Sequence, residues 1–111
     1  MTEVKVTLKQ GHIVSITAEG HSGYGVEGED IVCASLSSIV QTAVLGLLMI
    51  AELELKMKRD DEAGYLKFTL PEKLSEKQDI QSQAILDTML CGISDLYETF
   101  SDYIELEVKN L

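Results

Sequence analysis

One long stretch without a helix breaker limits the folds that this chain can adopt. Between Ile31 and about Lys58 there is no proline, and Gly46 alone lowers the helix propensity. At about 1.5 Å per residue such a helix would be roughly 40 Å long, which is long for a chain of 111 residues. Apolar residues around 39–50 cover nearly its whole circumference. One face must therefore cover a sheet and another must meet a second helix or a second subunit, so we expect a homodimer that uses part of this helix.

Other segments alternate apolar and polar residues, which is the pattern of strands with one buried face. Two strands form a hairpin around Gln10 and Gly11, a third spans about 66–70 and ends before Pro71, and a last one spans 103–108. The side chains expected to face the core are Val4, Val6, Leu8, Val14, Ile16, Ala18, Leu66, Phe68, Leu70, Ile104, Leu106 and Val108.

A second helix is predicted from Ser75, which can cap its N-terminus, to about Phe100. Its apolar stripe consists of Ile85, Met89, Ile93, Leu96 and Phe100. The element order is then ββαβαβ. Because every strand has one polar face, both helices should lie on the same side of the sheet. We predict one domain over residues 1–111, an α/β two-layer sandwich with a four-stranded sheet, and the strand order is not predicted.

The charge balance bounds the partners of the chain. It has 19 acidic and 9 basic residues, a formal net charge of −10. Such a surface repels the phosphates of nucleic acids and membranes and attracts basic partners. The longest uninterrupted apolar run, Ala43–Ala51, is shorter than the roughly 20 residues that cross a bilayer. We expect neither nucleic acid nor membrane as a partner, and no cofactor.

The cysteines indicate a reducing compartment. Two cysteines far apart, Cys33 and Cys91, behind an N-terminus without an apolar signal-peptide core, do not make a disulfide framework. We therefore expect a cytoplasmic protein with free thiols.

The stretch from Gly20 to Cys33 lies between the predicted hairpin and the long helix. It holds His21, which is one of two histidines, Cys33, which is one of two cysteines, and four of eight glycines. Asp30 is expected to cap the helix, because its carboxylate can accept amide hydrogens of the first turn. The glycines of this loop are Gly20, Gly23, Gly25 and Gly28. A base and a nucleophile therefore flank a glycine-rich loop, and we expect the function there.

Two interpretations of this loop meet physical objections. Residues 23–28 spell G-x-G-x-x-G between a strand and a helix, as in dinucleotide sites. Glu27, Glu29 and Asp30 would however place negative charge where the pyrophosphate binds, and the long helix takes the place of the second strand with its ribose-binding acid. A metal site is the other interpretation, but its residues match no zinc spacing. They are His21, Glu27, Glu29, Asp30 and Cys33.

A cysteine nucleophile with a histidine base is the third interpretation. Asp30 as the N-cap would put Cys33 in the first helical turn, where free amides and the helix dipole favour a thiolate and an oxyanion. Three nearby acids oppose the thiolate, so His21 as imidazolium would supply the counter-charge. Both groups would meet at the sheet edge where open α/β folds bind ligands. Ser37 follows one turn after Cys33 on the same helix face.

From the residues alone, structural roles remain open beside this chemistry. A cysteine on an apolar helix usually packs in a core, a histidine beside a glycine usually lies in a surface loop, and the glycines can serve only a tight connection. Two further candidates are expected to be bystanders. His12 should be an exposed turn residue, and Cys91 should lie on the outer face of the second helix.

The motifs of this loop resemble those of a known family. Gly20-His21-Ser22, the glycine-rich loop and the run from Gly28 through Asp30-Ile31-Val32-Cys33 to Ser35 and Ser37 are similar to the ribosomal-processing cysteine proteases of Firmicutes and relatives. The similarity extends over essentially the whole chain. Ser22 and Ser35 stand where alanine is frequent in the family, and this change of one small residue for another affects little.

The resemblance implies a specific function. Members are cytoplasmic homodimers that remove an N-terminal extension from a large-subunit ribosomal protein, the twenty-seventh in the standard naming. By position, Cys33 would be the nucleophile and His21 the general base, with Asp30 as a possible orienting group and Ser37 as a supporting one. The loop with Gly20, Gly23, Gly25 and Gly28 would be mobile over the active site and would order on substrate.

A non-catalytic interpretation is kept beside the protease. A dimer that grips a basic ribosomal segment through its acidic rim and its loop would share the same composition. Cleavage of the ribosomal precursor to a product with a defined N-terminus would distinguish the enzyme from this binding module.

Overall fold

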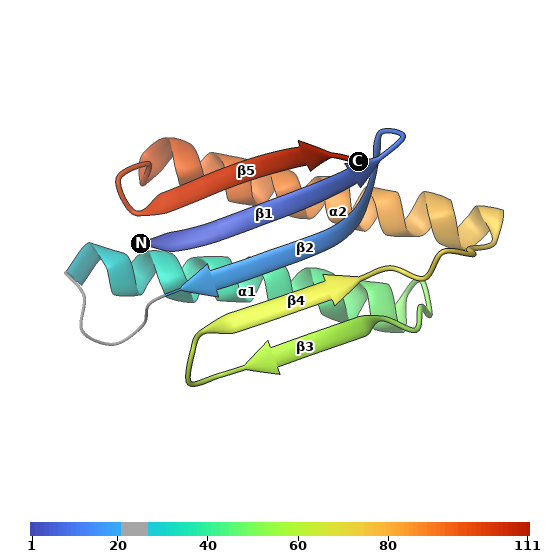
Figure 1. Ribbon diagram of the computed structural model, residues 1–111, viewed down its shortest axis with the longest axis horizontal. Helices are drawn as coiled ribbons and strands as arrows, with labels where there is room; N and C mark the ends of the chain where they lie inside the picture. The colour runs from blue at the N-terminus through green and yellow to red at the C-terminus, as the bar shows by residue number, and fades with distance from the viewer. Residues whose placement is uncertain (21–26) are drawn as a thin grey trace.

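The computed structural model describes the backbone of residues 1–20 and 27–111, and the side chains of residues 1–20 and 31–111 (Figure 1). Over these residues the chain forms one sheet and two helices in the order ββαββαβ. The elements are β1 (Thr2–Lys9), β2 (His12–Gly20), α1 (Glu27–Met49), β3 (Lys56–Asp60), β4 (Tyr65–Thr69), α2 (Glu76–Thr99) and β5 (Ile104–Asn110).

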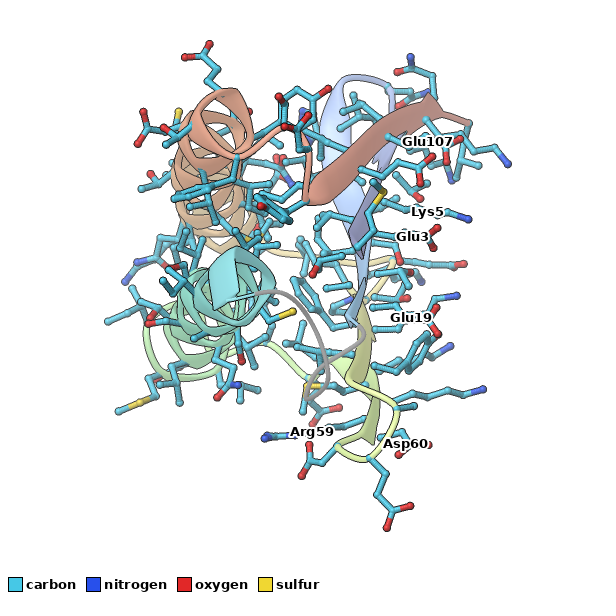
Figure 2. All side chains as sticks on the ribbon, turned by 90° about the vertical axis from the view of Figure 1, so that its left-hand side faces the viewer. Glu3, Lys5, Glu19, Arg59, Asp60 and Glu107 are labelled. Carbon is cyan, nitrogen blue, oxygen red and sulfur yellow. The ribbon has the colours of Figure 1, made fainter. Side chains whose placement is uncertain are left out.

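The sheet has five strands in the order β3-β4-β2-β1-β5. All neighbouring strands are antiparallel except β1 and β5, which are parallel. Both helices cover the same face of this sheet, and the other face is open (Figures 1 and 2). The predicted two-layer α/β arrangement is thereby confirmed, whereas the predicted four strands and the order ββαβαβ are wrong by one strand.

The missing strand is β3, because α1 ends earlier than predicted. The helix stops at Met49 and not near Lys58. Glu52 adopts a positive φ of 54°, and the Leu53 N–H donates to the Leu47 carbonyl at 3.0 Å, so the chain leaves the helix axis. The following Lys56–Asp60 segment pairs with β4 and is exposed at every residue.

The hairpin between β1 and β2 forms as predicted but with a bulge. Gln10 and Gly11 have φ values of 53° and 80°, as a two-residue type I′ turn requires. The pairing register shifts between Thr7 and Leu8. Ile13 is therefore fully buried and Val14, which was expected in the core, is half-buried.

Helix α2 follows its prediction closely. Ser75 forms a capping box with Gln78, and the Phe100 N–H donates to the Leu96 carbonyl where the helix ends. Its Ser82, Leu86, Met89 and Ile93 are buried. On β5, by contrast, Val108 lies on the inner face beside the buried Val6 but is 45% exposed, because this edge strand has no neighbour on its outer side.

The two helices pack closely where glycines face isoleucines. A Cβ at Gly46 of α1 would lie 3.4 Å from Ile85 of α2, and one at Gly92 of α2 would lie 3.5 Å from Ile39 of α1. The helices therefore run antiparallel, and glycine allows their backbones to approach. The expectation that α1 meets both the sheet and a second helix is confirmed.

Helix α1 is apolar well beyond its uninterrupted run. Its segment Ile31–Met49 has a mean hydropathy of 2.0, so by length and composition alone it could cross a membrane. In the fold this segment covers the sheet, with Val32, Leu36, Val40 and Leu47 almost fully buried. A helix that packs in a protein core can meet the same criterion of length and hydropathy, so the criterion alone is weak evidence for a membrane span.

Candidate active site

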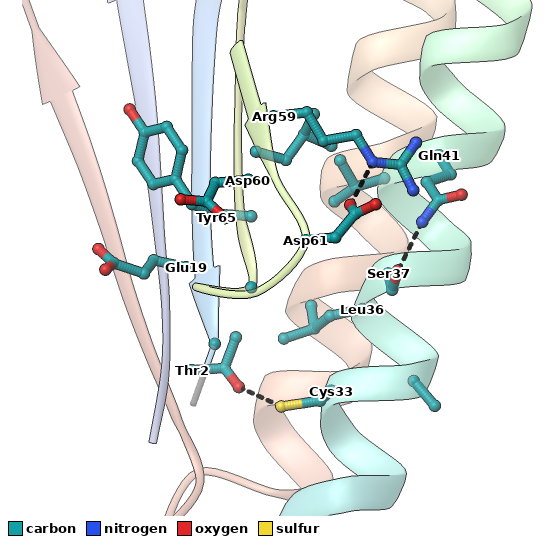
Figure 3. Close-up of a pocket in the computed structure, with 16 residues that line it drawn as sticks. Thr2, Glu19, Cys33, Leu36, Ser37, Gln41, Arg59, Asp60, Asp61 and Tyr65 are labelled. Atoms are coloured by element: carbon teal, nitrogen blue, oxygen red, sulfur yellow. Dashed lines mark hydrogen bonds and ion pairs between the residues drawn. The ribbon is translucent and has the colours of Figure 1, made fainter. Parts of the chain in front are cut away.

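The thiol of Cys33 lies at the edge of the sheet where β1 begins and β2 ends. Cys33 is in the second turn of α1 and is half-buried. Its Sγ lies 3.0 Å from the hydroxyl of Thr2, the first residue of β1, and either atom can be the donor (Figure 3). Thr2 itself is only 4% exposed. The thiol is therefore held against the sheet from inside the fold.

A cavity of about 390 Å³ opens beside this thiol, between α1 and the strands β2, β3 and β4. Its apolar lining comes from Ala18, Leu36, Val40 and Leu66. Its polar lining residues are Thr2, Glu19, Ser37, Gln41, Arg59, Asp60, Asp61 and Tyr65. Of these, Glu19, Asp60 and Tyr65 direct their side chains away from α1, to the open face of the sheet (Figure 3). Such a cavity can receive an apolar side chain of a peptide while polar groups contact its main chain.

Two glycines allow the close approach of backbone to the thiol. A Cβ at Gly20 would lie 3.2 Å from Cys33 Sγ and 3.3 Å from Thr2 Oγ1. Gly64, in the turn between β3 and β4, has a φ of 64°, and a Cβ there would overlap the carbonyl oxygen of Gly20. The Gly20 N–H in turn donates to the Gly64 carbonyl at 2.9 Å. Gly64 therefore fixes the end of β2 that contacts Cys33.

Some of the predicted site residues meet in this cavity. Cys33, Gly20 and Ser37 all line it. Ser37 Oγ accepts a hydrogen bond from Gln41 Nε2 at 2.7 Å, one turn further along α1. Ser37 is thus close to the thiol in the fold, with its hydroxyl bonded to another side chain of the cavity.

Other predicted site residues cannot be placed at the cavity. His21, Gly23 and Gly25 lie outside the described residues. Asp30 and Gly28 are part of α1, and their side-chain surroundings are not described. The pairing of His21 with Cys33 therefore stays a prediction.

The start of α1 corrects two expectations. The helix begins at Glu27, so Asp30 lies in its first turn and is not its N-cap, and Gly28 belongs to the helix and not to the loop. Acidic residues favour the first turn of a helix, which explains why the run with Glu27, Glu29 and Asp30 is helical. Cys33 is consequently in the second turn, beyond the first four residues whose amides lack a helical acceptor. The predicted supply of free helix-start amides to Cys33 is wrong.

The sequence did not indicate Thr2 or the β3–β4 residues of the cavity. Thr2 is separated from Cys33 by 31 positions, and no local pattern marks that contact. Arg59 and Asp61 follow the predicted end of the long helix near Lys58. Their side chains form an ion pair of 2.6 Å at the cavity, with 52% and 77% of the side chains exposed. If β3 had been predicted, Arg59 and Asp61 would have been placed at the end of a strand of the sheet beside the cavity.

A row of acidic side chains crosses the open face of the sheet beside this end. Glu3 pairs with Glu19 on β2 and with Glu105 on β5, and Tyr65 pairs with both Glu19 and Asp60. Figure 2 shows Glu3, Glu19 and Asp60 on the side away from the helices. We call Glu105, Glu3, Glu19 and Asp60 the acidic row. Like charges on neighbouring strands destabilise a sheet, so the row gathers carboxylates at this end of the open face at a cost in stability, with Lys5, Lys67 and Lys58 in the next register row.

The remaining reactive side chains lie elsewhere. Cys91 is exposed on α2, as expected. His12 is 53% exposed at the hairpin, where its Nδ1 lies 3.2 Å from Asp79 of α2. Among the residues whose side chains are described, no group of three or more His, Cys, Asp and Glu could hold a metal ion. Of the metal candidates named from the sequence, only Cys33 is among those residues.

A family model described as Cysteine protease Prp matches residues 1–105. The chain belongs to this family. It is therefore a cysteine protease of the Prp family, and the resemblance noted in its loop motifs is confirmed over nearly the whole chain.

Individual Prp proteins and solved structures agree with this assignment. The chain is 24% identical over 106 residues to the ribosomal processing cysteine protease Prp of Bacillus subtilis, covering 93% of this chain and 95% of that protein. It is 26% identical over 110 residues to Prp of Staphylococcus aureus (strain Mu50), covering 98% of this chain and 100% of that protein. The crystal structure of SMU.848 from Streptococcus mutans matches with a TM-score of 0.88 and 27% identity, over 100% of this chain and 96% of that one.

A solved Prp structure also carries a trapped reaction product. S. aureus Prp with a covalently linked product peptide matches this fold with a TM-score of 0.81 and 25% identity, over 98% of this chain and 100% of that one. The structure of the same protein with a substrate peptide matches with a TM-score of 0.86 and 24% identity, over 98% of this chain and 100% of that one. This second match shows that the two chains share a fold. The fold of this chain is thus one that acts on peptides in a relative.

Proposed function

We propose that this protein is an endopeptidase that uses Cys33 as its nucleophile and removes the N-terminal extension of the twenty-seventh protein of the large ribosomal subunit. The observation that carries the proposal is the half-buried Cys33 thiol at the mouth of a cavity of about 390 Å³. The free thiol, the space for a peptide and the membership of the Prp family support the same chemistry.

The proposed reaction has two covalent steps. His21 takes the thiol proton of Cys33, and the thiolate attacks the carbonyl carbon of the scissile peptide bond. The C–N bond then breaks, protonated His21 gives its proton to the leaving amine, and an acyl thioester stays on Cys33. Water, deprotonated by His21, hydrolyses the thioester and restores the thiol. Asp30 and Ser37 are proposed as supporting groups, and Gly20, Gly23, Gly25 and Gly28 as the loop that orders on substrate.

The charge of the protein supports a basic substrate. The acidic row, from Glu105 to Asp60, lies at the same end of the sheet as the cavity, and the net charge of the chain is −10. A cationic ribosomal extension would be attracted to this surface, and counter-ions would weaken the attraction. Such a substrate and the free thiols also support a cytoplasmic site of action.

The outer surface of α1 supports a homodimer. Leu45, Leu48, Met49 and Ile50 at its C-terminal end are 55%, 42%, 72% and 63% exposed. A cluster of large apolar side chains at one end of a helix is typical of a protein interface.

Light scattering at micromolar concentration should give twice the mass of the chain, and Leu45→Glu should reduce the measured mass toward that of the monomer. Val108→Glu on β5 is the matched control. A monomer for the unmodified chain would contradict the dimer.

A second candidate function is a dimeric module that binds the basic segment without cleaving it. The acidic row favours this alternative, because it would grip a cationic chain whether or not chemistry follows. The two candidates differ in the product that they leave.

The test is incubation of the protein with the ribosomal precursor, followed by mass spectrometry and N-terminal sequencing of the product. Cys33→Ala should abolish cleavage while the protein stays folded. Cys91→Ala, which removes the exposed thiol on α2, should cleave at the unmodified rate. Cleavage by folded Cys33→Ala would overturn the assignment, and binding of the precursor without any product would favour the module.

A further inference from the structure

The hydroxyl of Thr2 forms a hydrogen bond with the Cys33 thiol. Its Oγ1 lies 3.0 Å from Sγ, and the whole residue is 4% exposed. A buried hydroxyl without a partner is costly, and the described side chains include no buried polar atom without one. The sulfur is therefore the partner that satisfies this hydroxyl.

The fold holds this hydroxyl in place from several directions. The Thr2 N–H donates to the Tyr103 carbonyl at 2.9 Å, and Thr2 pairs with Gly20 on β2 and with Ile104 on β5. A Cβ at Gly20 would lie 3.3 Å from Thr2 Oγ1 and 3.4 Å from Thr2 Cγ2, so the Thr2 side chain packs directly against the backbone of Gly20. The branched side chain of threonine further restricts χ1. Thr2 is thus a fixed support for the thiol.

The chemistry of the pair changes when the thiol loses its proton. As a thiol, Cys33 can donate to Thr2 Oγ1 or accept from it. As a thiolate it can only accept, so the hydroxyl must donate. A hydrogen bond to the charged form of a group favours that form. The hydroxyl therefore favours the thiolate and fixes the direction in which the sulfur lone pairs point.

We propose that Thr2 is a positioning residue for peptide cleavage, whose hydroxyl donates to Cys33 Sγ and holds the thiolate at the cavity for attack. The proposal rests on the proposed role of Cys33 as nucleophile. The proton of the thiol goes to the general base, while the hydroxyl keeps its own proton and turns it toward the sulfur. Thr2 forms no covalent bond with the substrate.

A purely structural role makes a different prediction. If Thr2 only fills space at the start of β1, then Thr2→Val, which has nearly the same shape, would preserve the site. Thr2→Ser would then be the more harmful change, because it removes a buried methyl group. If the hydroxyl acts on the sulfur, the order of the two variants is reversed.

The experiment measures the rate at which iodoacetamide alkylates Cys33 in the unmodified protein, Thr2→Val and Thr2→Ser. The rate is followed across a pH range around the ordinary pKa of a thiol, about 8.5. Mass spectrometry of the peptide that contains Cys33 excludes any contribution from Cys91. Thermal unfolding shows that each variant is folded.

Loss of the hydroxyl should slow alkylation by up to about tenfold near neutral pH, because the thiolate loses a hydrogen-bond donor. At high pH, where every thiol is ionised, the rates should converge, and Thr2→Ser should follow the unmodified profile. The charged and titratable groups that face the thiol from the other sides of the cavity are unchanged in all three proteins. Among the described residues they are Arg59 and Asp61, whereas Glu19, Asp60 and Tyr65 direct their side chains to the open face of the sheet (Figure 3).

The outcomes separate this inference from the proposed function. A folded Thr2→Val with the unmodified pH profile would overturn the role of the hydroxyl, even if the unmodified protein cleaves the precursor. Slower alkylation of Thr2→Val near neutral pH that disappears at high pH would support it, even if the precursor is not a substrate. Equally slow alkylation of Thr2→Ser would also overturn it, because packing would then be the cause.

Discussion

Gly64 and Gly20 illustrate how single residues control this site. Gly64 combines a positive φ with a backbone contact to the carbonyl of Gly20, and Gly20 lies directly against the Cys33 thiol. A side chain at Gly64 would therefore affect the thiol indirectly, by displacing the end of β2. A substitution of Gly64 tests this series of contacts.

Gly64→Ala should lower both stability and the alkylation rate of Cys33. Its Cβ would overlap the Gly20 carbonyl, so the end of β2 must move, in addition to the roughly 1–2 kcal/mol that a left-handed conformation costs a residue with a Cβ. Thermal unfolding and alkylation measure the two effects.

Gly11→Ala is the matched control for this substitution. Gly11 also has a positive φ, of 80°, but a Cβ there would have nothing within 4 Å. It should lose only the conformational term and leave Cys33 unaffected. Equal losses in the two variants would contradict the contact of Gly64 with β2.

At the scale of elements, α2 is attached to β2 through a side chain that replaces a strand partner. Gln83 accepts from the Ile13 N–H at 2.9 Å and donates to the Ile13 carbonyl at 3.0 Å. These are the backbone groups next to the bulge between β1 and β2. The helix thereby pairs polar groups that the shifted register leaves free.

Gln83→Leu should destabilise the fold by about 1–3 kcal/mol, because both backbone groups of Ile13 lose their partner in a partly buried position. Chemical denaturation measures the loss. Gln81→Leu on the same helix serves as the control, since Gln81 has no such pair with β2 in the described part of the chain. A loss no larger than that of Gln81→Leu would show that water replaces Gln83 at no cost.

The elements also show what could be predicted from the sequence. Helix α2 was predictable because its signals are local, namely the Ser75 capping box and an apolar stripe that includes Met89 and Ile93. Strand β3 was not, because Lys56–Asp60 consists largely of good helix formers and is exposed throughout. Its pairing with β4 is a tertiary effect that overrides local propensity.

The site was predictable to the same extent. His21 and Cys33 were expected to meet where the second strand ends. Gly20, which precedes His21, does lie against Cys33, whereas His21 is outside the described residues. The start of α1 was predicted too late in the sequence, at Asp30 and not at Glu27. The reason is that acidic residues are favourable both as the N-cap and in the first turn of a helix. Thr2 could not be predicted, because its contact depends on the insertion of β1 between β2 and β5.

At the scale of the whole molecule, the charge distribution predicts how a substrate approaches. The acidic row includes Glu19, which lines the cavity, whereas Glu107 lies on the same face with Lys5 as its neighbour on β1. Glu19→Gln should lower kcat/KM for a basic peptide by about 2- to 5-fold at low salt, and the difference should vanish in about 1 M salt, where charges are screened within about 3 Å.

Glu107→Gln is the control for this measurement, because Glu107 lies beside a basic residue, Lys5, on β1. It should leave kcat/KM nearly unchanged at either salt concentration. If Glu19→Gln behaved like Glu107→Gln, the acidic row would not take part in recruiting the substrate.

The parallel pairing of β1 with β5 has a consequence for the synthesis of this protein. Thr2 is held by the carbonyl of Tyr103 and by its pairing with Ile104, so the support of the thiol comes from residues that the ribosome adds about a hundred positions later. A nascent chain that already contains Cys33 and the whole of α1 still lacks β5. Cys33 therefore reaches its final surroundings only after nearly all of the chain has been made, and the fold itself delays the packing of this thiol until translation is almost complete.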